Sequence, residues 1–309
     1  MKVERGDRRL LMFQEIEKGG SGEEIAEKAG VSRTAVWKFV RRLEELGYEV
    51  EVDRKSGYRL VSSPDPSPFH MALAALKIPG VERYYHFDEV DSTNRFAKEV
   101  SNAVVFSESQ SSGRGRLGRR WESERGGVYM SLSLNMTIPV SEIPKVTLLS
   151  GLAVCRALED YGARIKWPND VLVGGKKVSG ILSEFVGEEM AAKVVVGIGV
   201  NVRNRVPDAL RDRAISLHEV DENVRITEIF TRICEQLSNL LSAFPQKWGE
   251  ILEEWKRLSD TIGREVRVSL YGEEVVGKAV DVDADGGLIV VSGEGRRKVI
   301  SGECFYTNY

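Results

Sequence analysis

The sequence predicts an α+β protein in three parts: a small helical domain with a β-hairpin, a central domain with a mixed sheet, and a small C-terminal β domain. The length of 309 residues is more than a single domain usually needs. Helical periodicity ends in a hairpin pattern within residues 22–61, and short alternating strands return after residue 262. We therefore expect domains at residues 1–63, 69–260 and 261–309. The linker at residues 64–68 belongs to the segment "SSPDPSP", whose alternating prolines favour a stiff, extended chain.

The composition is that of an ordinary globular protein with little net charge. Apolar residues make up 42% of the chain, charged residues 29%, and the formal charge is −3. This balance argues against nonspecific coating of nucleic acid, although it is compatible with a local basic face. Cys155, Cys234 and Cys304 lie far apart, without metal-ligand spacing, so we expect reduced thiols and no dedicated metal site. No apolar run has the length of a membrane span or a signal peptide, which predicts a soluble, cytoplasmic protein.

The N-terminal domain is predicted to contain two helices joined by a tight turn. "GEEIAEKAG" ends at Gly30, and "VSRTAVWKFVRRLEELG" restarts with Ser32 as the N-cap and Gly47 as the C-terminal stop. "YEVEVDRKSGYRLV" then alternates as two strands around a turn at residues 55–57. This is the layout of a winged helix-turn-helix. The positions of the second helix expected to face the core are Val36, Phe39, Val40, Leu43 and Leu46.

The opposite face of this second helix is basic. It carries four positive charges before its first acid, Glu44, which suits a helix in a major groove beside phosphates. A solvated surface helix and a protein-docking module are the alternatives, and the short turn with the following hairpin favours DNA. The candidate DNA-binding residues are Ser32, Arg33, Thr34, Trp37, Lys38 and Arg41, and Arg42 adds the fourth charge.

The other two domains are predicted from strand and helix patterns. In the central domain we expect strands at residues 103–108, 128–136, 163–167, 171–173, 177–185 and 191–202, and helices at residues 147–162 and 226–244. In the C-terminal domain we expect strands at residues 263–270, 273–282, 286–292 and 295–303. Turns at residues 271–273, 284–287 and 293–295 have the spacing of a small β-barrel.

A loop rich in glycine and arginine, "QSSGRGRLGRRW" at residues 110–121, is the most unusual segment. "GRGRLG" fits G-x-G-x-x-G, but it leads into a strand rather than a helix, so a dinucleotide-binding loop is excluded. Kinase and P-loop signatures are incomplete as well. Glycine lets the backbone fold around a ligand, and arginine matches the oxygens of phosphate or carboxylate. A polyanion-binding loop is therefore the functional interpretation, with a solvated or RNA-binding loop as the alternative.

Two further segments place polar groups at the ends of elements. In "KWPNDVLVGGKKVSGILSE", Asn169 and Asp170 precede a strand, and a Gly-Gly turn leads to Lys177. Taken alone, a lysine at this position is usually solvated. "DEVDSTNRFAKE" places Ser92, Thr93 and Asn94 at a helix start, where capping would be a sufficient role.

Together, "DSTN", "Q-x-x-GRGRLGRRW", "KWPND", "KKVSGILSE" and "GIGVNV" resemble the biotin–protein ligases in order and spacing. With the N-terminal winged helix, the chain is similar to the bifunctional biotin–protein ligases that also repress biotin genes. The resemblance runs from about Gly22 to Cys304. It implies a class II synthetase-like central domain and an SH3-like C-terminal barrel.

The resemblance also implies a two-step reaction, in which biotin and ATP form biotinyl-5′-AMP and a carrier-protein lysine then takes the biotin. Catalysis is assigned to Lys177, Arg116, Arg114 and Asp170. Biotin is assigned to Ser92, Thr93, Asn94, Gln110, Arg114, Gly115, Arg116 and Lys177. The nucleotide is assigned to Arg116, Arg119, Trp121, Asn169, Lys177 and Asn201. Leu117 stands where some members carry another arginine, so the family does not fix the charge of the loop.

The implied partners are Mg²⁺ arriving with ATP, a biotin carboxyl carrier protein, operator DNA and a second copy of the chain. No membrane partner is expected. Two other functions stay open: a lipoate or octanoate ligase of the same fold, and a transcription factor that senses biotin without catalysis. The polar "STN" and Gln110 favour a ureido ring over a plain acyl chain, and the intact loop and Lys177 favour catalysis.

Overall fold

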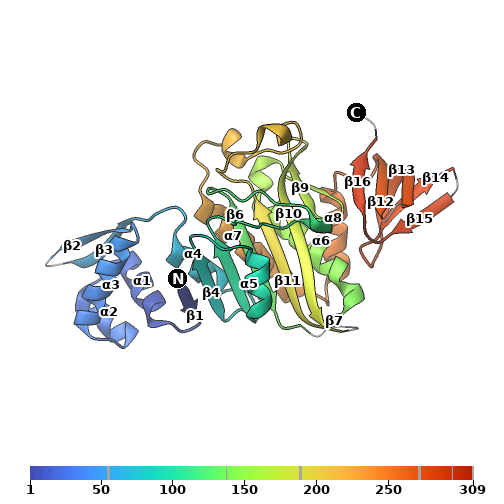
Figure 1. Ribbon diagram of the computed structural model, residues 1–309. Helices are drawn as coiled ribbons and strands as arrows, with labels where there is room; N and C mark the ends of the chain where they lie inside the picture. The colour runs from blue at the N-terminus through green and yellow to red at the C-terminus, as the bar shows by residue number, and fades with distance from the viewer. Residues whose placement is uncertain (54–55, 137, 188–189, 271–272, 294, 308–309) are drawn as a thin grey trace.

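The computed structural model describes residues 1–53, 56–136, 138–187, 190–270, 273–293 and 295–307. Three parts follow one another across the molecule: the N-terminal helices, a central sheet with its helices, and a small C-terminal sheet (Figure 1). The predicted α+β class is confirmed. The turns predicted at residues 55–57, 271–273 and 293–295 each include residues outside the described ranges. Among the described helices, none has the length and apolar character needed to cross a membrane.

The N-terminal part is the predicted winged helix-turn-helix. Its elements are α1 (Arg8–Lys18), α2 (Gly22–Ala29), α3 (Arg33–Glu45), β2 (Glu49–Asp53) and β3 (Gly57–Ser62). Gly30 ends α2 in the left-handed conformation (φ +63°), and the Ser32 hydroxyl accepts a hydrogen bond from the Ala35 amide at the start of α3. The predicted inward positions of α3 are buried apart from Leu46, which is half-buried.

The central domain is built on a nine-stranded mixed sheet in the order β1-β4-β5-β6-β11-β10-β9-β8, with β7 paired to β11. The strands are β1 (Lys2–Glu4), β4 (Arg83–Phe87), β5 (Ala103–Ser107), β6 (Val128–Leu134), β7 (Ile138–Pro139), β8 (Arg164–Lys166), β9 (Asp170–Val173), β10 (Lys176–Gly187) and β11 (Met190–Val200). β4 and β5 run parallel, and the other pairs are antiparallel. Each central strand predicted from the sequence is present.

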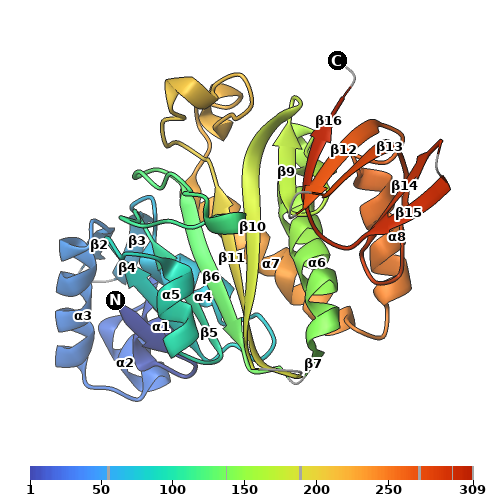
Figure 2. The ribbon, with the colours of Figure 1, turned by 45° about the vertical axis from the view of Figure 1, so that its right-hand side comes forward.

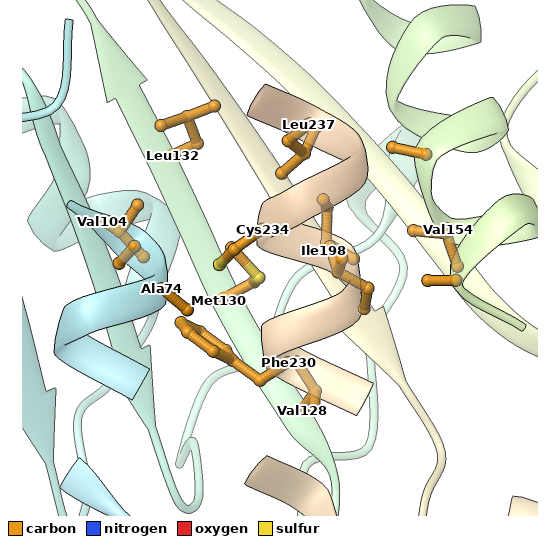
Figure 3. Close-up of a cluster of buried hydrophobic side chains, with 14 of the residues drawn as sticks. Ala74, Val104, Val128, Met130, Leu132, Val154, Ile198, Phe230, Cys234 and Leu237 are labelled. Carbon is orange, nitrogen blue, oxygen red and sulfur yellow. The ribbon is translucent and has the colours of Figure 1, made fainter. Parts of the chain in front are cut away.

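Helices cover the two faces of this sheet. They are α4 (Pro68–Ala75), α5 (Thr93–Glu99), α6 (Ile143–Ala157), α7 (Ile226–Ala243) and α8 (Trp248–Leu258). Phe230, Cys234 and Leu237 of α7 face the strand that carries Met130 (Figure 3). α5 packs instead around Val105 and Val195. Because side chains alternate along a strand, α5 and α7 lie on opposite faces.

The winged helix is joined to the central domain by contacts that the sequence does not predict. β1 pairs with β4, so the first residues of the chain form an edge of the central sheet. Asp65 in the proline-rich linker accepts hydrogen bonds from the amides of Ile226 and Thr227, at 2.9 and 2.8 Å, and thereby caps α7. Phe69 of α4 stacks on Phe13 of α1. The linker is therefore packed against the protein.

The C-terminal part is a small antiparallel sheet in the order β15-β14-β13-β12-β16. Its strands are β12 (Glu265–Leu270), β13 (Glu273–Val282), β14 (Leu288–Ser292), β15 (Gly295–Val299) and β16 (Glu303–Tyr306). The strand expected at residues 295–303 divides in two, because the chain turns at Gly302 (φ +141°). This sheet lies on the β9 side of the central sheet, and the winged helix lies on the β4 side (Figure 2).

Candidate functional site

All the residues assigned above to biotin, nucleotide and catalysis line one cavity of about 1170 Å³. It opens between the start of α5, the glycine–arginine loop, strands β10 and β11, a segment at residues 204–214, and the C-terminal sheet. The predicted residues in its wall are Ser92, Thr93, Asn94, Gln110, Arg114, Gly115, Arg116, Arg119, Trp121, Asn169, Asp170, Lys177 and Asn201. Segments more than 100 residues apart in sequence thus meet at one site.

The floor of the cavity includes the backbone of β11 at two glycines. Alternation along "GIGVN" turns Ile198 and Val200 into the core and leaves Gly197 and Gly199 on the α5 face. A Cβ on Gly197 would lie 2.2 Å from Asn94 Oδ1, and one on Gly199 would lie 2.5 Å from the indole of Trp121. These glycines therefore let Asn94 and Trp121 rest directly on the strand backbone.

A network of neutral polar groups forms one end of the cavity. The Thr93 amide and hydroxyl donate to Gln110 Oε1 at 2.8 and 3.1 Å, and Gln110 Nε2 donates to Ser123 Oγ at 2.8 Å. Ser131 Oγ lies 2.8 Å from Thr93 Oγ1 and 2.6 Å from Asn94 Oδ1. Ser92 caps α5 through a hydrogen bond from the Arg95 amide at 3.4 Å. Such a set of donors and acceptors suits an uncharged polar ring.

The glycine–arginine loop sends its cations in different directions. Arg116 donates to Asn169 Oδ1 at 3.0 Å, and across to the C-terminal domain at Gly302 O (3.2 Å) and Ser301 Oγ (2.9 Å). Burial lowers the pKa of its guanidinium, against the opposing effect of nearby carboxylates. Arg119 forms an ion pair with Glu303 of the C-terminal domain. The C-terminal domain is thus in direct contact with the loop.

Arg114 and Gly115 complete the loop's part of the cavity. Arg114 is exposed, whereas Gly115 donates its amide to Arg119 O at 2.8 Å. Gly113 next to them is buried, and a Cβ there would lie 2.4 Å from Trp121 O. Only glycine fits this position, so the loop backbone can pass close beneath its own closing tryptophan.

Lys177 is held through both its side chain and its backbone. Its Nζ lies 2.6 Å from Asp170 Oδ1 and 5.3 Å from the centre of the Trp121 ring. Its amide donates to Arg213 O at 2.8 Å, and its carbonyl accepts from Ile215 at 3.0 Å. The segment at residues 204–214 therefore runs alongside the start of β10 and fixes where the lysine stands.

Asn169 and Asn201 organise the backbone around this cation. Asn169 Nδ2 donates to Ile181 O at 3.0 Å, and the Ile181 amide donates back to Asn169 O at 2.8 Å. Asn201 Nδ2 donates to Ile215 O at 3.2 Å, while its Oδ1 accepts from Asn204 at 3.1 Å. Both amides lie in the cavity wall and also hold neighbouring segments in place.

Several residues of the site were missed by reasoning from the sequence. Ser131 is fully buried behind the cavity wall, where it contacts Thr93 and Asn94. It carries a signal, because serines at positions 131 and 133 alternate with apolar residues in "VYMSLSL" and so share one face. No sequence signal marks Lys166, Arg264 and Tyr306, which also line the cavity. The two cations lie 4.7 and 4.6 Å from the centre of the tyrosine ring, at the junction with the C-terminal sheet. Cys304 also lines the wall, and burial raises its pKa to about 12, so its thiol stays protonated.

The second candidate site is the exposed face of α3. The predicted DNA-binding residues Ser32, Arg33, Thr34, Trp37, Lys38 and Arg41 are all exposed. Trp37 keeps half of its surface accessible, with the Arg41 guanidinium 5.7 Å from its ring centre. Arg41 and Arg42 also pair with Glu44 and Glu45 one turn later. The face therefore presents cations and a half-exposed tryptophan to the solvent.

Comparison with known proteins connects both sites to one family. A family model described as the biotin/lipoate A/B protein ligase family matches residues 87–201. The biotin protein ligase C terminal domain matches residues 261–306, and an HTH domain matches residues 8–59.

Relatives match along nearly the whole chain. The chain is 34% identical to the bifunctional ligase/repressor BirA of Bacillus subtilis (strain 168) over 308 residues, which covers 92% of each protein. It is 29% identical to the Escherichia coli (strain K12) protein of the same description, over 87% of each. Among solved structures, a biotin protein ligase from Aquifex aeolicus in complex with biotin and ATP matches with a TM-score of 0.63 at 32% identity, over 72% of this chain and 97% of that one. The chain therefore belongs to the family of bifunctional ligase/repressors, with a helix-turn-helix, a biotin/lipoate protein ligase domain and a ligase C-terminal domain in one polypeptide.

Proposed function

We propose that the protein is a biotin–protein ligase that also represses transcription of biotin genes. The observation that carries the ligase activity is the layout of the cavity, in which a neutral polar pocket at Thr93 and Gln110 adjoins the cations Arg116 and Lys177. The neutral polar pocket fits a ureido ring. The adjoining cations are needed where a carboxylate approaches a phosphate, because the two anions repel each other.

In the first step, a carboxylate oxygen of biotin attacks the α-phosphorus of ATP, and pyrophosphate leaves as biotinyl-5′-AMP forms. Two anions approach each other, so nearby cations lower the barrier by offsetting their repulsion and the charge that grows on the phosphoryl oxygens. Lys177 and Arg116 are proposed for this task, with Arg114 covering the carboxylate and Arg119 the phosphates. Asp170, 2.6 Å from Lys177 Nζ, would keep the ammonium in place before the substrates arrive.

The nucleotide is proposed to lie along Trp121, Asn169 and Asn201, on the Gly199 side of the floor. ATP is proposed to enter as its Mg²⁺ complex. A carboxylate such as Asp170 and the phosphates themselves are the oxygen ligands that Mg²⁺ prefers.

In the second step, the amine of a lysine on a carrier protein attacks the acyl carbon, and AMP leaves. The mixed anhydride must be shielded from water until then. The contacts of Arg116 and Arg119 with the C-terminal domain support a role for that domain in keeping the loop closed. The proposed acceptor is a biotin carboxyl carrier protein, which would be met in the cytoplasm.

ATP–pyrophosphate exchange with purified protein tests the ligase and separates it from its rivals. We expect exchange that depends on biotin and is not supported by lipoate or octanoate. Exchange with lipoate or octanoate instead would favour the acyl ligase of the same fold. Tight biotin binding without exchange would favour a sensor that has lost catalysis.

Repression is proposed to use α3 in the major groove and a homodimer. The outer half of β10 extends past the residues that pair with β9, and it presents Phe185 and Val186 at 40% and 44% exposure. Pairing of two such edges would bring two winged helices to a two-fold operator. We expect operator affinity, measured by fluorescence anisotropy, to rise when biotin and MgATP are both present and to fall with salt. If operator affinity responded to salt but not to the ligands, DNA binding would be supported, and the proposal that biotinyl-5′-AMP acts as corepressor would be contradicted.

A further inference from the structure

A carboxylate just outside the cavity wall contacts the polar network. Glu184 lies on β10, where its Oε2 accepts a hydrogen bond from Asn94 Nδ2 at 2.9 Å and its Oε1 accepts one from Lys98 Nζ at 2.6 Å. The strand register accounts for this position. Ser131 and Leu182 both stand opposite Gly197, and Glu184 follows two residues later on the same face.

The neighbours of the Asn94 amide fix its orientation. Its Nδ2 faces two groups that can only accept, the Glu184 carboxylate and the Leu182 carbonyl, the latter at 3.3 Å. Its Oδ1 is left facing Ser131 Oγ at 2.6 Å, so that hydroxyl must donate. A flipped amide would place Oδ1 against the carboxylate, with two acceptors in contact. Glu184, together with the longer contact to the Leu182 carbonyl, therefore selects one of the two amide orientations.

The orientation of the Asn94 amide also fixes the hydrogen-bond directions as far as Thr93. Ser131 has one hydroxyl hydrogen and gives it to Asn94, so toward Thr93 it can only accept. The hydroxyl hydrogen of Thr93 is then used within the network, on Ser131 Oγ or on Gln110 Oε1. Both Thr93 Oγ1 and Asn94 Oδ1 consequently offer lone pairs to the cavity.

We propose that Glu184 is a positioning residue, which sets the donor and acceptor pattern of the ring pocket so that the pocket accepts hydrogen bonds from ligand N–H groups. The inference rests on the proposed biotin function. It names the ligand class as a cyclic urea, whose ring N–H groups meet the acceptors. A ring or chain without N–H groups would leave those acceptors unpaired and would be rejected.

The test is ATP–pyrophosphate exchange with the full chain. Biotin is varied at saturating MgATP to give the KM for biotin, and MgATP is varied at saturating biotin to give the KM for MgATP. Glu184→Ala is expected to raise the KM for biotin about tenfold or more, while the KM for MgATP and the melting temperature change little. Glu184→Gln should recover most of the loss, since the one side-chain oxygen of glutamine can take the place of Glu184 Oε2 and accept from Asn94. Glu254→Ala is the matched control, because Glu254 has the same 25% exposure and binds Arg156 away from the cavity.

An unchanged KM for biotin in Glu184→Ala would overturn the inference and leave the ligase in place. A rise in both KM values with a lower melting temperature, or no recovery by Glu184→Gln, would also overturn it by showing a purely structural role. Absence of biotin-dependent exchange in the unaltered protein would overturn the proposed function, and this inference with it.

Discussion

At the scale of single residues, Lys177 and its neighbour Lys176 differ in position. Lys177 points its ammonium at Asp170 inside the cavity, whereas Lys176 donates to Arg211 O outside it. We expect Lys177→Ala to lower the rate of biotin-dependent exchange by a factor of about 100 or more, because the developing phosphoryl charge loses a cation. Lys176→Ala should stay near wild type. Equal activity of the two variants would contradict the assignment of Lys177, provided that circular dichroism shows both folded.

The charge of Glu184 also depends on single residues. Burial by itself raises the pKa of this carboxyl, but hydrogen bonds from Lys98 and Asn94 and the charges of Lys98 and Arg114 outweigh it, so the pKa lies below its usual range. A lowered carboxyl pKa contributes stabilisation that is present above the unfolded pKa and is lost as the pH falls through the folded one.

The resulting pH dependence is testable by removing one partner. Lys98→Met is expected to raise the pKa of Glu184, so that less of this pH-dependent stabilisation is present in the variant. The difference in the free energy of unfolding between the unaltered protein and the variant should then shrink as the pH falls from about 8 to about 4, when urea denaturation is followed by circular dichroism. Superimposable pH profiles would show that Lys98 does not control this carboxylate.

At the scale of elements, β11 combines a buried strand with a ligand surface. Val196, Ile198 and Val200 fill the core on one face, and glycines clear the other face for Asn94 and Trp121. The alternation in "VVVGIGVNV" therefore serves two purposes at once, and it explains why a strand interior contains two glycines despite their cost.

Adding a methyl group to either glycine should affect different substrates. Gly197→Ala displaces Asn94 and should raise the KM for biotin, while Gly199→Ala displaces Trp121 and should raise the KM for MgATP, each by about fivefold or more. Gly249→Ala in α8 is the control, because its Cβ would meet open space and alanine stabilises a helix by up to about 1 kcal/mol. Identical effects of the two β11 variants on both substrates would argue against separate subsites.

At the scale of the whole molecule, the winged helix and the ligase domain are joined by a strand pairing and by a helix cap. β1 adds the N-terminal residues to the central sheet, and Asp65 caps α7, which itself packs beneath that sheet. The segment at residues 204–214 contacts Lys177, and the chain then continues through residues 215–225 into α7. The cavity segment and the linker of the winged helix thus both reach the N-terminal end of α7.

Loss of the cap should be measurable in the stability of the full chain. Asp65→Ala removes the acceptor for the Ile226 and Thr227 amides and should lower the free energy of unfolding by about 1–2 kcal/mol. Asp160→Ala, which breaks the exposed pair with Arg232, should cost less than about 1 kcal/mol. Urea denaturation followed by circular dichroism compares them, and equal midpoints would show that the Asp65 contact contributes no more than a surface ion pair.

Features that depend on neighbours along the chain were determined by the sequence itself. Ser32 and Gly30 mark the helix ends because caps act within one turn, and α3 buries Val36 and Phe39 because helical period decides its faces. The strands of the central sheet follow from their apolar pattern. The motifs around Arg116 and Lys177 singled out residues that the structure brings to one cavity.

The tertiary structure alone decided which distant groups meet. Short polar segments such as residues 2–4 carry too weak a pattern to predict a strand, and β1 exists because β4 offers it a free edge. In the sequence, nothing distinguishes Glu184 from any other charged residue of a strand. Only the register of β10, β11 and β6 places it beside Asn94. Likewise, the contacts of Ser301 and Gly302 with Arg116 join residues 185 positions apart or more. Helix periods and caps act over a few residues, whereas these pairings depend on how whole domains pack, and that is the physical reason why they emerged only in three dimensions.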